Sequence, residues 1–84
     1  MSKIQDIWVI DDDEAIRFVL QRALRRRGYE VECFETVGDV RLALEQRQPR
    51  ALLTDIRLPD ADGLSIVDTL EQLGIEIPVI AMTA

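Results

Sequence analysis

The side chains best suited to chemistry in this sequence are aspartates that follow short apolar runs. Asp11, Asp12 and Asp13 come directly after the run at residues 7–10, and Asp55 follows the run at 51–54. Carboxylates gathered in a low-dielectric crevice repel one another, so such a cluster needs a cation. Because the sequence has no histidine, oxygen-only ligands favour a hard ion such as Mg²⁺. A carboxylate beside that ion could attack phosphorus and form an aspartyl phosphate.

One aspartate of this group has a simpler structural explanation. An aspartate after a buried strand is most often a helix cap or a loop residue, and Asp13 fits that role because its carboxylate can accept free N–H groups of a following helix. The adjacent pair Asp11 and Asp12, matched by Asp55 after a second apolar run, is harder to explain structurally. We therefore expect a functional cluster of Asp11, Asp12 and Asp55.

Short apolar runs alternate along the chain with segments of helical periodicity. The runs predict strands at residues 7–10, 29–34, 51–54 and 78–83. Helical patterns lie between them, from residue 13 or 14 to 28, from 36 to 49, and from 64 to 74. This alternation with short connections predicts an α/β fold, a doubly wound parallel sheet with helices on both faces.

Local signals support these elements. The first helix ends at Gly28, and a capping pair of Thr36 and Asp39 opens the second. Trp8 and Cys33 lie on apolar positions of strands and are expected in the core. The first helix has one apolar face, formed by Ile16, Val19, Leu20, Ala23 and Leu24.

The predicted sheet positions the aspartates. In an open parallel sheet, ligands bind at the carboxyl ends of the strands, beside the point where the strand order reverses. Asp11 and Asp12 end the first strand, Asp55 ends the third, and Thr83 ends the fourth. If the first and third strands are neighbours, Asp11 and Asp12 face Asp55 across one crevice.

Composition excludes several classes of protein. A chain of 84 residues with 48% hydrophobic and 31% charged residues indicates one small globular domain. Its net charge of −6 argues against direct contact with nucleic acid. No apolar run approaches the roughly 18–20 residues of a membrane span. A single cysteine forms no internal disulfide, which fits a reducing cytoplasm.

Three segments taken together resemble the receiver domain of two-component response regulators. They are VIDDDEAIR at 9–17, LLTDIRLPDADG at 52–63 and PVIAMTA at 78–84. Within that family, WVIDDDEAIRFVL and TDIRLP are most similar to the nitrogen-regulation (NtrC-like) type, whose full proteins activate sigma-54-dependent transcription. The resemblance implies the flavodoxin-like receiver fold with strand order 2-1-3-4. It also implies a phosphorylation-dependent signalling switch, not an enzyme, that relays a histidine kinase's phosphoryl group to output domains of the parent protein.

The resemblance also implies roles for individual residues. Asp55 matches the phosphoacceptor of the family. Asp11, Asp12 and the backbone carbonyl of Arg57 match the groups that hold Mg²⁺ together with Asp55. Thr83 matches the switch hydroxyl that turns toward the phosphoryl group.

The loop after Asp55 contains further matching residues. Pro59 and Gly63 match the loop that shapes the family's site. Asp60 and Asp62, which precede Gly63, are interpreted as turn residues.

The chain differs from a complete receiver domain at its end. Residues 1–84 match the N-terminal part only, because the fifth strand, its lysine and the last two helices have no counterpart. Lys3 precedes the first strand and cannot replace that lysine. We expect a weak fold, aggregation, or a homo-oligomer formed through the fourth-strand edge or the first helix. The apolar side chains expected to be exposed there are Ile16, Val19 or Ala23.

Two other functions compete with this interpretation. Asp11 and Asp13 also resemble the start of haloacid-dehalogenase-type phosphatases, with Asp11 as nucleophile, although Glu14 and Ala15 follow where that motif usually continues with threonine. A pseudo-receiver, an interaction domain that is never phosphorylated, would show no dependence on Mg²⁺. The aspartate that becomes phosphorylated distinguishes these hypotheses.

Overall fold

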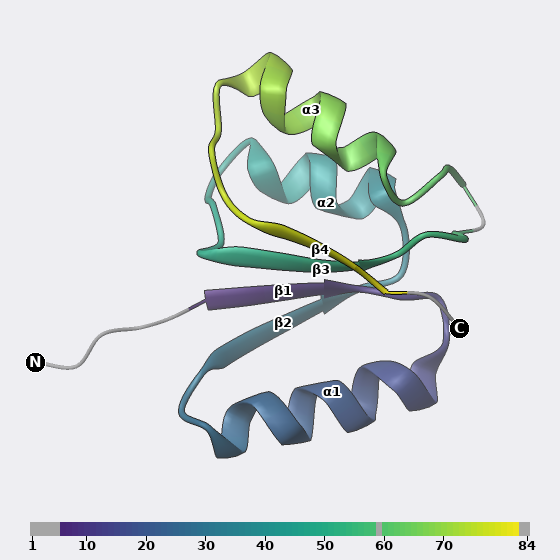
Figure 1. Cartoon of the computed structure of the whole chain (residues 1–84), viewed down its shortest axis with the longest axis vertical. Coiled ribbons are helices and arrows are strands. Elements are labelled where there is room, and N and C mark those ends of the chain that lie inside the picture. The colour runs from purple at the N-terminus through teal and green to yellow at the C-terminus, as the bar shows by residue number, and fades with distance from the viewer. Residues whose placement is uncertain (1–5, 59, 83–84) are drawn as a thin grey trace, which may run out of the picture.

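The computed structural model describes residues 6–58 and 60–82. Pro59 and Thr83, for which the sequence predicts roles, lie outside these residues. Strands and helices alternate along the described chain, as predicted (Figure 1). In order they are β1 (Asp6–Ile10), α1 (Glu14–Arg26), β2 (Glu30–Phe34), α2 (Val37–Leu44), β3 (Ala51–Asp55), α3 (Ser65–Leu73) and β4 (Val79–Met82).

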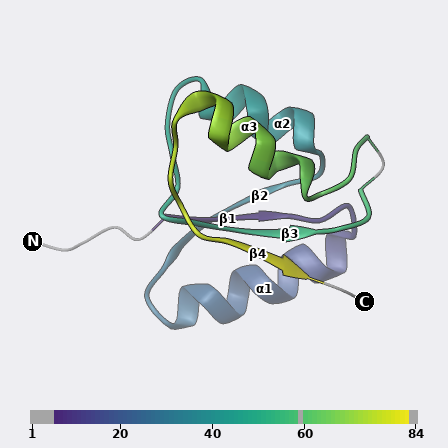
Figure 2. The ribbon, with the colours of Figure 1, turned by 45° about the horizontal axis from the view of Figure 1, so that its top comes forward.

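The strands form one parallel sheet in the order β2-β1-β3-β4. Helix α1 lies on one side of the sheet, and α2 and α3 lie on the other side (Figures 1 and 2). This arrangement confirms the predicted doubly wound fold and its strand order. Since β1 and β3 are adjacent, their carboxyl ends lie side by side.

The hydrophobic core lies between the sheet and the pair α2 and α3. Trp8 is 1% exposed there, as predicted for a core residue, and its ring centroid lies 4.9 Å from that of Phe34. Strands supply one side of this core and helices the other. Its buried members are Trp8, Ile10, Val37, Val40, Ala43, Leu44, Leu52, Ile66 and Leu70.

The opposite face of the sheet is covered less completely. No described residue of α1 is fully buried, and Ile16 and Val19 are 42% and 60% exposed. Ile80 of β4 pairs in register with Leu53 and therefore lies on this same face, where it is 53% exposed. Ala23 is exposed as well, so the predicted exposure of the first helix is confirmed. Cys33, predicted in the core, is only partly buried because it lies on the edge strand that faces α1.

The helix ends follow the local signals of the sequence. The Asp13 carboxylate accepts the N–H groups of Ala15 and Ile16, so Asp13 caps α1 as predicted. Thr36 caps α2 by accepting the N–H of Asp39 at 3.1 Å. Among the described residues, no helix is long and apolar enough to cross a membrane.

Candidate functional site

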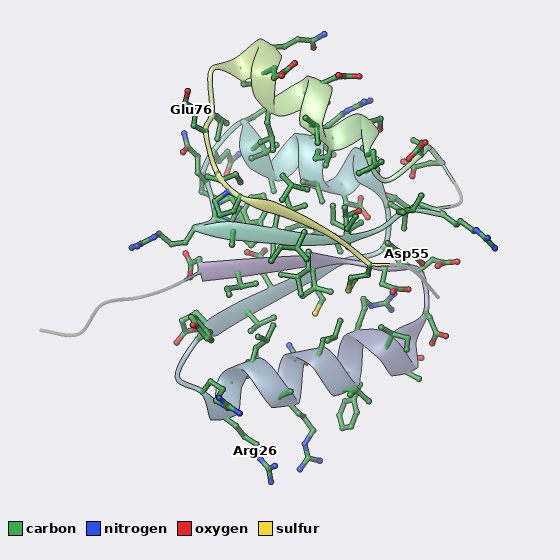
Figure 3. The ribbon with its side chains drawn as sticks, viewed as in Figure 1. Arg26, Asp55 and Glu76 are labelled. Atoms are coloured by element: carbon green, nitrogen blue, oxygen red, sulfur yellow. The ribbon has the colours of Figure 1, made fainter. Side chains whose placement is uncertain are left out.

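The register between β1 and β3 brings two of the predicted aspartates together. Ile10 of β1 is paired with Thr54 of β3, and both side chains are fully buried. The next residue on each strand is an aspartate, so Asp11 and Asp55 emerge beside each other at the carboxyl end of the sheet. Figure 3 shows Asp55 at this end, where α1 begins, and Glu76 at the opposite end.

The three predicted carboxylates meet at this position. One oxygen from each of Asp11, Asp12 and Asp55 lies within 4.8 Å of the others. Asp11 is buried, Asp55 is half-buried and Asp12 is exposed, so the cluster opens to solvent on one side. It belongs to an open cleft of about 480 Å³, lined by Asp11, Asp12, Asp13, Ile16, Leu20, Asp55 and Met82.

The electrostatics of the cluster favour a bound cation. Burial raises the pKa of Asp11 above its usual value, and the neighbouring Asp55 and Asp12 carboxylates raise it further, against a lowering by the Asp13 N–H. A divalent ion would relieve this repulsion. Three carboxylate oxygens on an open, solvent-facing site suit Mg²⁺, which binds through a few carboxylates and keeps several waters.

Backbone contacts orient the buried part of the cluster. Asp11 Oδ1 accepts the N–H of Asp13 at 2.9 Å, and Arg17 Nη1 donates to the Asp11 carbonyl oxygen at 2.7 Å. Asp55 Oδ1 accepts the N–H of Arg57 at 3.1 Å. Asp13 itself is engaged as the cap of α1, which separates it from the other three acids of the cleft.

The loop after β3 folds tightly back onto Asp55. Gly63 N–H donates to the Ile56 carbonyl at 2.8 Å, and Arg57 and Asp62 form an isolated antiparallel bridge. A Cβ on Gly63 would lie 1.8 Å from the Asp55 carbonyl oxygen, so only glycine fits at this position. Gly63 thus lets the loop pack directly against Asp55, while the role in shaping the site that the family resemblance implies stays a prediction.

Asp60 has a role that the sequence prediction missed. The sequence predicts a turn residue here, but the two carboxylate oxygens of Asp60 accept the N–H groups of Val37 at 3.1 Å and Gly38 at 2.9 Å. These contacts hold the pKa of Asp60 below its usual value, with the Gly38 N–H as the largest cause. No local pattern reveals a contact across 22 or 23 residues. Asp62 does act in a turn, since it accepts the N–H of Leu64 at 2.9 Å.

The structure therefore brings Asp11, Asp12 and Asp55 together, with Arg57 hydrogen-bonded to Asp55. The roles of Asp55 as phosphoacceptor and of Asp11, Asp12 and the Arg57 carbonyl as metal ligands stay predictions. The predicted role of Thr83 lies outside the described residues.

Comparison with known proteins identifies relatives along nearly the whole chain. The model of the response regulator receiver domain matches residues 7–84. The chain is 48% identical over 79 residues to the DNA-binding transcriptional regulator NtrC of Proteus hauseri, and 45% identical over 78 residues to that of Escherichia coli K12. These matches cover 94% and 93% of the chain but only 17% of each relative.

Solved structures agree with this relationship. The beryllofluoride-activated NtrC receiver domain matches with a TM-score of 0.84 and 42% identity, over 99% of this chain and 67% of that one. The MaeR response regulator bound to beryllium trifluoride matches with a TM-score of 0.86 and 28% identity, over 96% of this chain and 68% of that one. The chain therefore belongs to the response regulator receiver family, and it is a signalling domain similar to the receiver domains of NtrC.

Proposed function

We propose that the chain accepts a phosphoryl group on Asp55 in a reaction that requires Mg²⁺. The observation that carries this proposal is the meeting of three carboxylates at the carboxyl ends of β1 and β3. Asp11, Asp12, Asp55 and the backbone carbonyl of Arg57 would hold the ion. When bound, Mg²⁺ would neutralise charge on the phosphoryl oxygens and so allow an anionic nucleophile to approach.

Asp55, Arg57 and Thr83 would each have a separate role in this reaction. An Asp55 carboxylate oxygen would attack phosphorus while the bond from phosphorus to the donor's leaving group breaks. With the phosphohistidine of a histidine kinase as donor, the broken bond is the P–N bond, and the imidazole of that histidine is the leaving group. The Arg57 N–H, which already donates to Asp55 Oδ1, would keep that carboxylate oriented. The hydroxyl of Thr83 would turn toward the phosphoryl group and donate a hydrogen bond to it, which is the switch role that the family resemblance suggests.

The partners of the whole protein form part of the same proposal. The chain spans about a sixth of the length of the NtrC relatives it matches, at 17%. We expect residues 1–84 to be the N-terminal part of a receiver domain in a cytoplasmic regulator. A sensor histidine kinase would supply the phosphoryl group, and output domains of the parent protein would activate transcription. Self-association would use the β4 edge or α1, where apolar side chains are exposed.

The proposal is tested by phosphorylating the chain with a small acyl-phosphate donor and Mg²⁺. Intact mass and peptide mapping would show one hydroxylamine-labile phosphoryl adduct on Asp55, absent without Mg²⁺ and absent in Asp55→Asn. Asp62→Asn is the matched control, because Asp62 lies in the same loop but its carboxylate accepts the Leu64 N–H and is not part of the three-carboxylate cluster. This control should keep the adduct.

Other outcomes of this experiment favour the competing functions. An adduct on Asp11 would replace the receiver proposal with the phosphatase hypothesis. No adduct under any condition, together with no Mg²⁺ binding, would favour a pseudo-receiver that works only through interactions.

A further inference from the structure

We propose that Asp60 is a positioning residue that ties the β3–α3 loop to the start of α2 and thereby holds the Arg57 carbonyl in place for Mg²⁺. This inference rests on the proposed function, since it concerns the same metal site. It adds a residue that does not touch the reacting groups.

The contact of Asp60 with α2 replaces a missing part of the helix cap. Thr36 Oγ1 accepts the N–H of Asp39, and the first bond within the helix runs from Val40 N–H to the Thr36 carbonyl at 3.4 Å. The N–H groups of Val37 and Gly38 are left over, and Asp60 accepts both with separate oxygens. A carboxylate at this end also complements the helix dipole, so the contact is charge-assisted.

Asp60 itself belongs to the β3–α3 loop, which also carries Arg57. This loop is closed at its base by the Gly63 N–H to Ile56 carbonyl bond and by the bridge of Arg57 with Asp62. Asp60 lies between the two bridge residues, three positions after Arg57. A loop held at its base and by its middle residue has few conformations left. The Arg57 carbonyl is thus presented from a constrained backbone.

A purely structural role for Asp60 makes a different prediction. If Asp60 only capped α2, its loss would resemble the loss of Thr36, the local cap at the same helix end. Both substitutions would lower stability, and neither would act on the metal site. Thr36→Ala is therefore the matched control, because Thr36 accepts an α2 N–H but belongs to no part of the loop.

The test compares the unaltered chain with Asp60→Ala, Asp60→Asn and Thr36→Ala. Mg²⁺ affinity is measured by calorimetric titration, and amide hydrogen exchange of Gly38 is followed without metal. We expect Asp60→Ala to weaken Mg²⁺ binding about tenfold or more, the size typical of lost support behind a metal ligand. Thr36→Ala should change the Kd less than about twofold by the same reasoning. Gly38 exchange should accelerate in Asp60→Ala.

The Asn variant keeps the test informative if Asp60→Ala fails to fold. It retains one acceptor oxygen and the shape of the side chain, so its Mg²⁺ Kd should lie between those of the unaltered chain and Asp60→Ala. An unchanged Kd in a folded Asp60 variant would overturn the inference alone. An equal loss of Mg²⁺ affinity in Thr36→Ala and Asp60→Ala would also overturn the inference. Failure of the unaltered chain to bind Mg²⁺ would overturn the proposed function and this inference together.

Discussion

At the scale of single residues, chemically identical aspartates have different roles because their carboxylates accept different backbone N–H groups. Asp13 is engaged with the first turn of α1, and Asp60 with the first turn of α2. Asp11 and Asp55 each accept one nearby N–H through Oδ1, and each places an oxygen in the cluster of three carboxylates. The candidate ligands are therefore the acids whose oxygens converge at the carboxyl ends of β1 and β3.

Replacement of Gly63 by alanine should damage the fold and the site together. The added Cβ would lie 1.8 Å from the Asp55 carbonyl oxygen and 2.8 Å from Thr54 Oγ1, so the backbone of β3 or of the loop must move. We expect a loss of about 3 kcal/mol or more in the free energy of unfolding, at the upper end for overpacking. Urea denaturation measures this loss, and Mg²⁺ titration should show weaker binding.

Gly38→Ala is the control for this prediction. A Cβ on Gly38 would lie 3.5 Å from Asp60 Oδ2, which is ordinary van der Waals contact. Because alanine also favours helix over glycine, we expect unchanged or slightly raised stability, by up to about 1 kcal/mol. A Gly63→Ala variant as stable as Gly38→Ala would contradict the close approach of Gly63 to Asp55.

At the scale of elements, the two faces of the sheet differ in how completely helices cover them. Helices α2 and α3 contribute fully buried side chains to the core, among them Val40 and Ile66 at 0% exposure. Helix α1 has the sequence of an amphipathic helix but buries none of its residues fully. Its position is held instead by partial contacts, which include the Arg17 to Asp11 carbonyl bond.

The same substitution on the two sides of the sheet should therefore have different costs. Val40→Ala opens a cavity in the core and should lower the free energy of unfolding by about 2 kcal/mol. Val19→Ala removes a side chain that is 60% exposed and should change it by less than about 0.5 kcal/mol. Chemical denaturation of both variants measures the difference. Equal costs would mean that α1 is buried in solution, by a second copy or another partner.

At the scale of the whole molecule, the uncovered face favours self-association. Val19 and Ile80 are exposed on the α1 side of the sheet, and β4 is an edge strand of the sheet as described. Burial of apolar surface favours pairing of two copies through this side, while the net charge of −6 on each opposes it. Salt screens this repulsion, so association should strengthen as ionic strength rises.

This association is tested by introducing one lysine on either side of the sheet. Val19→Lys and Ile80→Lys should weaken self-association by about tenfold or more in analytical ultracentrifugation, because they would bury a charge in the interface. Leu42→Lys on α2 alters charge equally at a residue that is 65% exposed, and it should have little effect. If Leu42→Lys disrupts association as strongly, the interface lies on the α2 side. A monomer at all concentrations would contradict the expected oligomer.

The sequence by itself determined the elements, because their signals are local. Apolar runs mark β1 and β3, Asp13 and Thr36 mark helix starts, and Gly74 at φ 71° ends α3 in the left-handed conformation that glycine favours. The alternation of elements also determined the fold class. It placed Asp11, Asp12 and Asp55 at strand ends, which made their cluster predictable once β1 and β3 were taken as neighbours.

Only the tertiary structure decided contacts between residues distant in the chain. The Asp60 carboxylate reaches the α2 N-terminus because a loop packs against that helix. No periodicity or turn motif in the sequence predicts a contact between residues so far apart in the chain. The partial burial of Cys33 and the exposure of Ile80 depend on which part of each sheet face a helix covers. Local propensities set the conformation of each segment, whereas burial and the pairing of distant polar groups arise only when the segments pack together.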